Sequence, residues 1–255
     1  MILFFNQPQS TGPFVYAIGD VHGQITQLEA LLAQLPLTSD DTLLFLGDYI
    51  DRGENSRAVV ERLIEIKAER PDTIFLRGNH EELLLNAFDE QEETRTAEGE
   101  DAEVPEKTML WLQNGGWETL RSYSPTEFSD WKAVFPETHL QFFRDTKREH
   151  LTDAYHFVHA GIALPGQMWD GMEYGLDDRL WIREPFLSSG EDYNGRIVIF
   201  GHTPQRTGRP LIMRNKIGID TAAVFGGPLT AAALDVTAIG RKRLKPKFYQ
   251  IKYPA

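Results

Sequence analysis

The first third of the chain alternates apolar runs with amphipathic stretches. Residues 14–18, 43–46 and 73–76 are short apolar runs with the length of buried strands. Between them, the leucines of residues 28–35 and the apolar side chains of residues 59–67 recur with the spacing of a helix. The order strand, helix, strand, helix, strand predicts the βαβ units of a largely parallel sheet, and so an α/β fold.

The rest of the chain predicts a helical region and then more strands. A helix is expected over residues 81–88, and the aromatic-rich residues 107–150 predict a helical cap with its own apolar face. Further strands are expected at residues 155–158, 196–200, 216–219, 229–234 and 248–251. The last three of these runs suggest a second sheet packed on the first.

One stretch, residues 89–106, has the character of a surface insertion. It holds nine acidic residues and one arginine, so it carries −8 of the chain's net charge of −12. A segment of this composition cannot bury enough apolar surface to pack, and we expect it to be solvated. We predict a single domain over residues 1–255 that contains this acidic insertion and the helical cap.

Composition excludes several classes of function. The 255 residues are 41% hydrophobic, which is enough for a core, and they include no cysteine. Disulfides, thiolate catalysis and zinc–thiolate sites are therefore excluded. A net charge of −12 argues against binding nucleic acid. No apolar run is long enough to span a bilayer, and residues 1–5 lack the basic flank of a signal peptide. We therefore expect a cytoplasmic protein without nucleic-acid or membrane partners.

Polar clusters directly follow five of the predicted strands. In sheets of this kind ligands bind beyond the carboxyl ends of the strands, so the clusters are expected to meet at one rim. They supply three imidazoles, two carboxylates and one amide carbonyl, from Asp20, His22, Asp48, Asn79, His159 and His202. Such donors suit two divalent ions, and Asp48 is placed to bridge them. Three other histidines, His139, His150 and His156, are expected to be structural.

The loop at residues 47–53 reads Gly-Asp-Tyr-Ile-Asp-Arg-Gly and directly follows an apolar run. Its two carboxylates, Asp48 and Asp51, lie three residues apart, so one can hold a metal while the other serves another purpose. Arg52 beside them is suited to bind phosphate with two hydrogen bonds. Taken alone, this segment is equally consistent with an ordinary turn. The agreement of all five clusters favours phosphoryl chemistry.

Five motifs resemble, in the same order, the signature blocks of the calcineurin-like metallophosphoesterases. They are Gly19-Asp20-Val21-His22-Gly23, Gly47-Asp48-Tyr49-Ile50-Asp51-Arg52-Gly53, Gly78-Asn79-His80-Glu81, His159-Ala160-Gly161 and Gly201-His202-Thr203. The Asp-Arg-Gly and Asn-His-Glu motifs further resemble the phosphoprotein phosphatases, especially their small bacterial and phage members. The resemblance implies a four-layer αββα sandwich of two mixed sheets flanked by helices.

The resemblance also implies a centre with two divalent ions, most simply Mn²⁺, with iron and zinc as the alternatives. Asp48 would bridge the ions. The other ligands would form two sets, with Asp20 and His22 on the first ion and Asn79, His159 and His202 on the second.

The remaining roles implied by the resemblance concern proton transfer and phosphate binding. His80 with Asp51 would be the acid pair, since a histidinium held by a carboxylate can protonate a leaving alkoxide. Arg52 would bind the phosphate together with Arg183, which ends the short motif Leu180-Trp181-Ile182-Arg183.

The function expected from these roles is hydrolysis of phosphate monoesters through attack of a hydroxide that bridges two metal ions. A serine/threonine protein phosphatase is the first hypothesis, with a phosphorylated protein or peptide, or a small phosphoester, as substrate. Hydrolysis of diadenosine polyphosphates, by a bis(5'-nucleosyl)-tetraphosphatase, is the alternative, since the stretch from Asp220 to Thr230 resembles such enzymes. A catalytically silent metal-binding scaffold is a third hypothesis, which His80 and Arg52 oppose.

Overall fold

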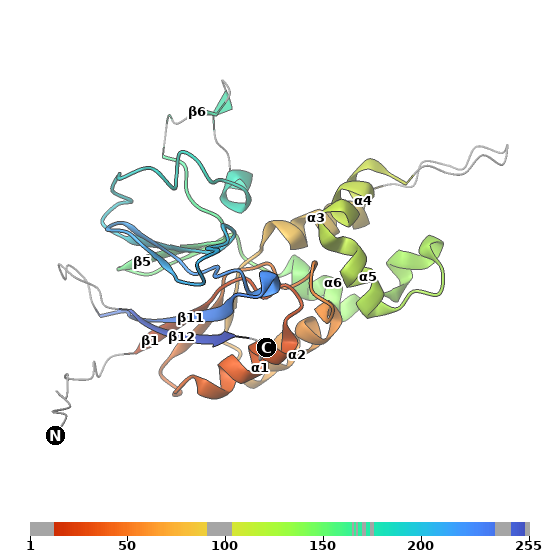
Figure 1. The fold of residues 1–255 in the computed structure, drawn as a ribbon, viewed down its shortest axis with the longest axis horizontal. Helices are drawn as coiled ribbons and strands as arrows, with labels where there is room; N and C mark the ends of the chain where they lie inside the picture. The colour runs from red at the N-terminus through yellow and green to blue at the C-terminus, as the bar shows by residue number, and fades with distance from the viewer. Residues whose placement is uncertain are drawn as a thin grey trace.

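Two five-stranded mixed sheets form the centre of the molecule (Figure 1). The computed structural model describes residues 13–90, 104–164, 166, 168–169, 172–173, 176–237 and 246–252. In the order of their pairing, the strands of the first sheet are β12 (Lys247–Lys252), β11 (Pro228–Asp235), β1 (Phe14–Ile18), β2 (Thr42–Phe45) and β3 (Ile74–Phe75). Those of the second are β4 (Glu149–Leu151), β5 (Tyr155–Val158), β8 (Ile197–Phe200), β10 (Lys216–Gly218) and β9 (Leu211–Ile212).

The helices connect and cover the first sheet. Helix α1 (Ile25–Gln34) links β1 to β2, α2 (Ser56–Glu69) links β2 to β3, and α3 (Asn79–Asp89) follows β3. The strands β1, β2 and β3 are parallel to one another, as the βαβ pattern predicts. Within the described ranges, no helix combines the length and the hydropathy needed to cross a lipid bilayer.

Strand β1 shows how the layers are held together. Its side chains alternate between two faces, as in any strand. Tyr16 and Ile18 belong to the apolar cluster formed with the helices, whereas Val15 and Ala17 belong to the cluster that lies between the two sheets. Both faces of β1 are therefore buried.

The outer face of the second sheet has a thinner cover. Val198 and Phe200 of β8 pack there against Ile182 and Phe186. These two residues follow a short 3₁₀-helix, Leu176–Leu180, and β6 (Met168–Trp169) pairs with β7 (Met172–Glu173) just before it. Short pieces and loops, rather than long helices, make this fourth layer in the part of the chain that the structure describes.

The predicted α/β fold with two sheets is confirmed, but the assignment of the last strands to a second sheet was wrong in part. Of the three runs assigned to a second sheet, only the one that forms β10 belongs to it. Strand β11 pairs antiparallel with β1, and β12 pairs antiparallel with β11, so both extend the first sheet. These pairings join the two ends of the chain, and the local patterns used for prediction carry no information about them.

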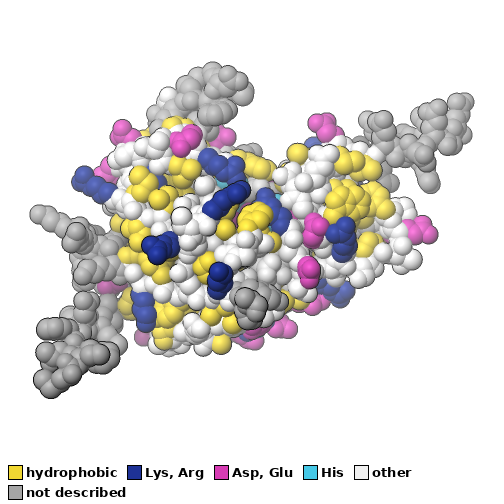
Figure 2. All heavy atoms as spheres, viewed as in Figure 1, with side chains coloured by type: hydrophobic (Ala, Val, Ile, Leu, Met, Phe, Trp, Pro, Cys, Tyr) yellow, Lys and Arg dark blue, Asp and Glu magenta, His cyan; other side chains and the backbone are white. Residues whose placement is uncertain are grey.

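The predicted helical region at residues 107–150 is indeed mostly helical. It contains α4 (Glu106–Trp111), a kinked turn (Leu112–Gly116) with non-helical backbone at Gly115, α5 (Trp117–Tyr123), a 3₁₀-helix (Phe128–Val134) and α6 (Glu137–Arg144). Figure 2 shows apolar side chains gathered on the surface over this region. Residues 91–103 of the acidic insertion lie outside the described residues. The single-domain organisation stays a prediction.

The turn after β2 depends on a glycine that no other residue can replace without strain. Gly47 has φ +106°, and a Cβ atom placed there would lie 2.4 Å from the backbone nitrogen of Gly78. We expect Gly47→Ala to lower the free energy of unfolding by about 1–3 kcal/mol, because it adds both backbone strain and a clash. Urea unfolding followed by circular dichroism measures this loss.

A matched glycine provides the control for this prediction. Gly190 is exposed and has no atoms within 4 Å of the position of an added Cβ. Gly190→Ala should leave the free energy of unfolding within about 0.5 kcal/mol of the wild type. Equal stability of the two variants would contradict the importance of the turn at Gly47.

Candidate active site

The six residues predicted as metal ligands meet at the carboxyl ends of five strands. Each lies in a loop or first helical turn after β1, β2, β3, β5 or β8, and none has more than 6% of its surface exposed. Strands β1, β2 and β3 run parallel, as do β5 and β8, so the strand ends in each sheet share one edge. The polar clusters therefore lie together at the carboxyl ends of the strands, as predicted.

The backbone at this rim is strained in the way that functional sites often are. Five non-glycine residues there adopt positive φ angles: His22, Asp48, Asp51, Arg52 and His202. Such angles are unfavourable for residues with a Cβ atom and persist only where surrounding contacts impose them. The strain indicates that the loops are shaped for the positions of these side chains.

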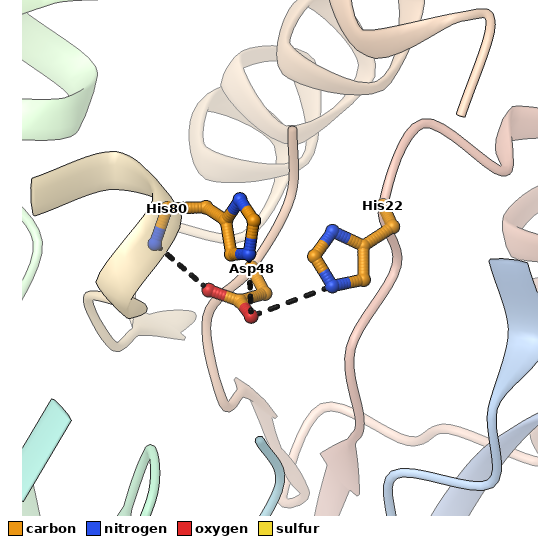
Figure 3. A group of neighbouring side chains, drawn as sticks. All are labelled: His22, Asp48 and His80. Atoms are coloured by element: carbon orange, nitrogen blue, oxygen red, sulfur yellow. Dashed lines mark hydrogen bonds and ion pairs between the residues drawn. The ribbon is translucent and has the colours of Figure 1, made fainter. Parts of the chain in front are cut away.

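Asp48 is the centre of the site (Figure 3). Its Oδ2 atom lies 3.4 Å from Nε2 of His22 and 3.9 Å from Nε2 of His80, and its Oδ1 lies 3.4 Å from Nε2 of His159. Burial alone would raise the pKa of Asp48, but the neighbouring imidazoles outweigh burial and hold that pKa below its usual range. Asp48 is therefore an anionic group shared by ligands on both sides.

A second cluster forms around the side-chain oxygen of Asn79. Nε2 of His159 lies 3.0 Å from this oxygen, and Nδ1 of His202 lies 2.9 Å from it. Nδ1 of His159 faces the carbonyl oxygen of Leu46 at 2.9 Å, so the proton of a neutral imidazole belongs on Nδ1. Burial lowers the pKa of His159 and favours that neutral form.

The position of the proton on the His159 ring shows whether a cation would fit between His159, Asn79 and Asp48. With its proton on Nδ1, Nε2 presents a lone pair to two acceptors, the amide oxygen of Asn79 and the carboxylate of Asp48. Three facing acceptors repel one another unless a cation lies among them. Nε2 of His202 is also buried without a hydrogen-bond partner. The donor set therefore fits a divalent metal ion.

Two groups of possible metal ligands share Asp48, which suits two ions with one bridging carboxylate. One group is His22, Asp48 and His80, and the other is Asp48, His159 and His202; within each group the ligand atoms lie within 4.8 Å of one another. His22 donates from Nδ1 to the carbonyl oxygen of Ile50, so its Nε2 carries the lone pair that could bind a metal and that faces Nη1 of Arg52 in this structure. Burial lowers the pKa of His22 to about 3, so it is neutral.

Asp20, which was expected to bind the first ion together with His22, contacts the backbone of His202. Its two carboxylate oxygens accept the backbone N–H of His202 at 3.1 and 2.9 Å. In the first group of described ligands, His80 stands where Asp20 was expected. Burial, and after it the charges of Asp220 and Asp48, raise the pKa of Asp20. Its role as a ligand of the first ion stays a prediction.

His80 and Asp51 form a fully buried pair. Nδ1 of His80 lies 2.7 Å from Oδ2 of Asp51, and neither side chain is exposed. Burial lowers the pKa of His80, but Asp48 and the hydrogen bond to Asp51 outweigh burial and raise that pKa overall. Nε2 of His80 has no hydrogen-bond partner. The imidazole is thus anchored at one nitrogen and able to donate a proton from the other.

The two predicted phosphate-binding arginines, Arg52 and Arg183, are both exposed. Nη1 of Arg52 lies 2.9 Å from Nε2 of His22, and its guanidinium lies 5.8 Å from the ring centre of Phe225. After burial and His159, the charge of Arg183 contributes to lowering the pKa of His202. Basic side chains gather in the middle of the face shown in Figure 2.

A buried lysine holds the segment that carries Arg183. Nζ of Lys216 donates to the carbonyl oxygen of Phe186 and, at 2.8 Å, to that of Ser189. Its charge also lies 4.4 Å from the ring centre of Phe186. Lys216 therefore fastens the loop after Arg183 to strand β10.

Two buried carboxylates near the predicted ligands, Glu81 and Asp220, were given no role in the sequence analysis. Glu81 was placed in a motif without a role, yet its carboxylate accepts the backbone N–H groups of Asp48, Tyr49 and Gly78 at 2.8–2.9 Å. Asp220 is 6% exposed, and burial raises its pKa to about 6. It follows β10 by two residues, so the rule that found the other strand-end carboxylates applies to it as well.

Comparisons with known proteins agree with this geometry. The profile of the calcineurin-like phosphoesterases matches residues 15–208. Serine/threonine-protein phosphatase 1 of Salmonella typhimurium is 29% identical over 223 residues, which are 86% of this chain and 91% of that protein. The asymmetrical bis(5'-nucleosyl)-tetraphosphatase PrpE of Bacillus mycoides is 26% identical over 240 residues, covering 84% of this chain and 87% of PrpE.

Among solved structures, a protein serine/threonine phosphatase from Saccharomyces cerevisiae is similar, with a TM-score of 0.64 and 15% identity. The match covers 97% of this chain and 83% of that one. At this identity the likeness concerns the fold alone.

The shared position of Asp48 leads to a prediction about metal binding. Manganese at about 100 times its dissociation constant should raise the free energy of unfolding of the wild type by about 2.7 kcal/mol. Asp48→Asn should remove most of this gain, because a neutral amide in the bridging position cannot offset two dications. Urea unfolding with manganese and with a chelator measures both values.

Asp153→Asn is the control, since Asp153 is an exposed aspartate between β4 and β5. It should keep the full stabilisation by manganese. If Asp48→Asn were stabilised as strongly as this control, Asp48 would not be a shared ligand.

Proposed function

Because the chain belongs to the calcineurin-like phosphoesterase family, we propose that it is a serine/threonine phosphoprotein phosphatase that uses two divalent ions. The observation that carries the proposal is the position of Asp48 between His22 on one side and His159 and His202 on the other, with the buried His80–Asp51 pair beside it. The similarity to serine/threonine-protein phosphatase 1 of Salmonella typhimurium supports the choice of substrate.

Asp48 would bridge the two ions. Asp20 and His22 would complete one coordination sphere, and Asn79, His159 and His202 the other. We propose Mn²⁺ as the ion, with iron or zinc as the alternatives, since imidazole and carboxylate donors suit all three. When bound, the ions would activate a water molecule and offset the negative charge of the phosphoryl group.

The chain's own residues would bind the phosphate and deliver a proton. Arg52 and Arg183 would donate hydrogen bonds to the non-bridging phosphate oxygens, where negative charge develops. As the bond between phosphorus and the leaving oxygen breaks, His80 would give the proton on Nε2 to that oxygen. Asp51 stabilises the charged imidazole through its 2.7 Å contact with Nδ1.

Hydrolysis of diadenosine polyphosphates is the second candidate function. The similarity to PrpE of Bacillus mycoides favours it, and it would use the same metal and phosphate ligands. The intact His80–Asp51 pair and both arginines oppose a catalytically silent scaffold. The cytoplasmic location and the lack of nucleic-acid and membrane partners stay predictions.

A comparison of substrates tests the proposed function. With manganese supplied, kcat/KM should be higher for a phosphoserine peptide than for diadenosine tetraphosphate, with p-nitrophenyl phosphate as the generic reference. A clear preference for diadenosine tetraphosphate would favour the second candidate function, hydrolysis of diadenosine polyphosphates. If none of the three substrates is hydrolysed, the catalytically silent scaffold is favoured.

The role of His80 leads to a prediction about leaving groups. His80→Asn should lower kcat on a phosphoserine peptide by about 10²–10⁴-fold, because an alkoxide needs a proton to leave. The same change should reduce kcat on p-nitrophenyl phosphate far less, because nitrophenolate leaves without one. Steady-state kinetics on both substrates measures the two losses.

His150→Asn provides the matched control, because His150 lies in β4, an edge strand of the second sheet, and is not among the predicted ligands. It should change neither rate by more than a small factor. Equal losses on both substrates in His80→Asn would exclude His80 as the acid.

A further inference from the structure

The helical cap reaches into the site and holds the partner of His80. The contacts come from residues 111–119, which comprise the end of α4, the kinked turn at residues 112–116 and the start of α5. Nε1 of Trp111 donates to both carboxylate oxygens of Asp51, at 3.1 and 3.2 Å. The hydroxyl of Thr119 donates to Oδ1 of Asp51 at 2.6 Å. Trp111, Thr119 and Asp51 are all fully buried.

These contacts set the orientation of the Asp51 carboxylate. Oδ1 accepts the hydroxyl proton of Thr119, and both oxygens accept the indole N–H of Trp111. Oδ2 also contacts Nδ1 of His80 at 2.7 Å. The oxygen of Thr119 also accepts the backbone N–H of Asp51 at 2.8 Å. One threonine hydroxyl therefore contacts both the backbone and the side chain of Asp51, so the carboxylate cannot rotate without losing a buried hydrogen bond.

The same segment fixes the neighbouring arginine. The carbonyl oxygen of Gly115 accepts the backbone N–H of Arg52 at 3.1 Å. Gly115 has φ +109°, and a Cβ atom there would lie 2.8 Å from the backbone nitrogen of Arg52. Asp51 and Arg52 themselves have φ of 71° and 67°, angles that non-glycine residues keep only under restraint. The cap supplies part of that restraint, and the hydroxyl of Ser56 in α2 adds to it by accepting the backbone N–H of Asp51 at 3.1 Å.

We propose that Thr119 and Trp111 are positioning residues for the acid step: by orienting Asp51 they direct Nε2 of His80 toward the leaving oxygen. This inference rests on the proposed function, because it assigns a task to residues around its acid. A purely structural role for the two donors would affect all substrates alike. A positioning role affects only those that need the proton.

Thr119 offers a pair of substitutions that separates these roles. Thr119→Val keeps the shape of the side chain and removes the hydroxyl, whereas Thr119→Ser keeps the hydroxyl. We expect Thr119→Val to lower kcat on the phosphoserine peptide by about 10–100-fold, the usual range for outer hydrogen-bond partners. On p-nitrophenyl phosphate its kcat should stay within about threefold of the wild type, and Thr119→Ser should restore both rates.

A double-mutant cycle shows whether Thr119 acts through His80. In the His80→Asn background, Thr119→Val should cause no further loss on the phosphoserine peptide, since residues that act as a unit are not additive. Trp111→Phe, which removes the other donor and keeps an aromatic ring, should give the same pattern as Thr119→Val. Additive losses would overturn the proposal.

A spectroscopic measurement on the metal-free protein is independent of turnover. The downfield proton resonance of His80 Nδ1–H, identified by its absence in His80→Asn, should be present in the wild type and Thr119→Ser. It should shift or disappear in Thr119→Val. An unchanged resonance together with unchanged selectivity would overturn the proposal.

Failure of the proposed function gives a different result. If the wild type does not hydrolyse the phosphoserine peptide but hydrolyses another alkyl phosphate, the substrate assignment fails. The same Thr119 comparison is then made on that alkyl phosphate. Equal losses on alkyl and aryl substrates in Thr119→Val would reject the positioning role while the phosphatase assignment stands.

Discussion

The geometry of the site depends on the hydrogen bonds that the Glu81 carboxylate accepts from the backbone of two loops. This carboxylate is fully buried, and it accepts N–H groups from the loop after β2, at Asp48 and Tyr49, and from Gly78 after β3. Two strand ends are thereby tied together at the point where the ligands leave the backbone. Burial and the charge of Asp48 raise the pKa of Glu81 to about 7, so this arrangement is costly and the N–H groups must offset the cost.

Much of the fold was predictable because, in its first half, each strand and helix packs against elements that are close to it in the sequence. The alternation of apolar runs and helical spacing identified β1, α1, β2, α2 and β3 in the right order, since each βαβ unit is built from neighbouring segments. The partners of the late strands were not predictable in this way. Phe14 pairs with Asp235 across almost the whole chain, and β11 is buried on both faces, so its pattern does not say which sheet it joins.

The site was predictable where its residues follow strands and was missed where they do not. Asp48, Asn79 and His159 stand at strand ends, and the topology alone brings them together. Trp111 and Thr119 lie 60 and 68 residues from the aspartate they contact, in helices whose aromatic residues look like any apolar core. Glu81 looked like an ordinary first-turn residue of α3, because the N–H groups it accepts belong mostly to another loop.

Two different parts of the fold therefore hold the residues of the site in place. The ligands around Asp48 are placed by the ends of the two sheets and by Glu81, whereas Asp51 and Arg52 are placed by the cap. Since cap residues contact the carboxylate of Asp51 and not that of Asp48 in the described structure, the position of the acid can change while the ligand geometry persists. Changes in the cap should then alter which leaving groups the enzyme accepts more than they alter metal binding. Under the positioning role proposed above, the helical cap belongs to the catalytic apparatus, although its sequence carries none of the five motifs.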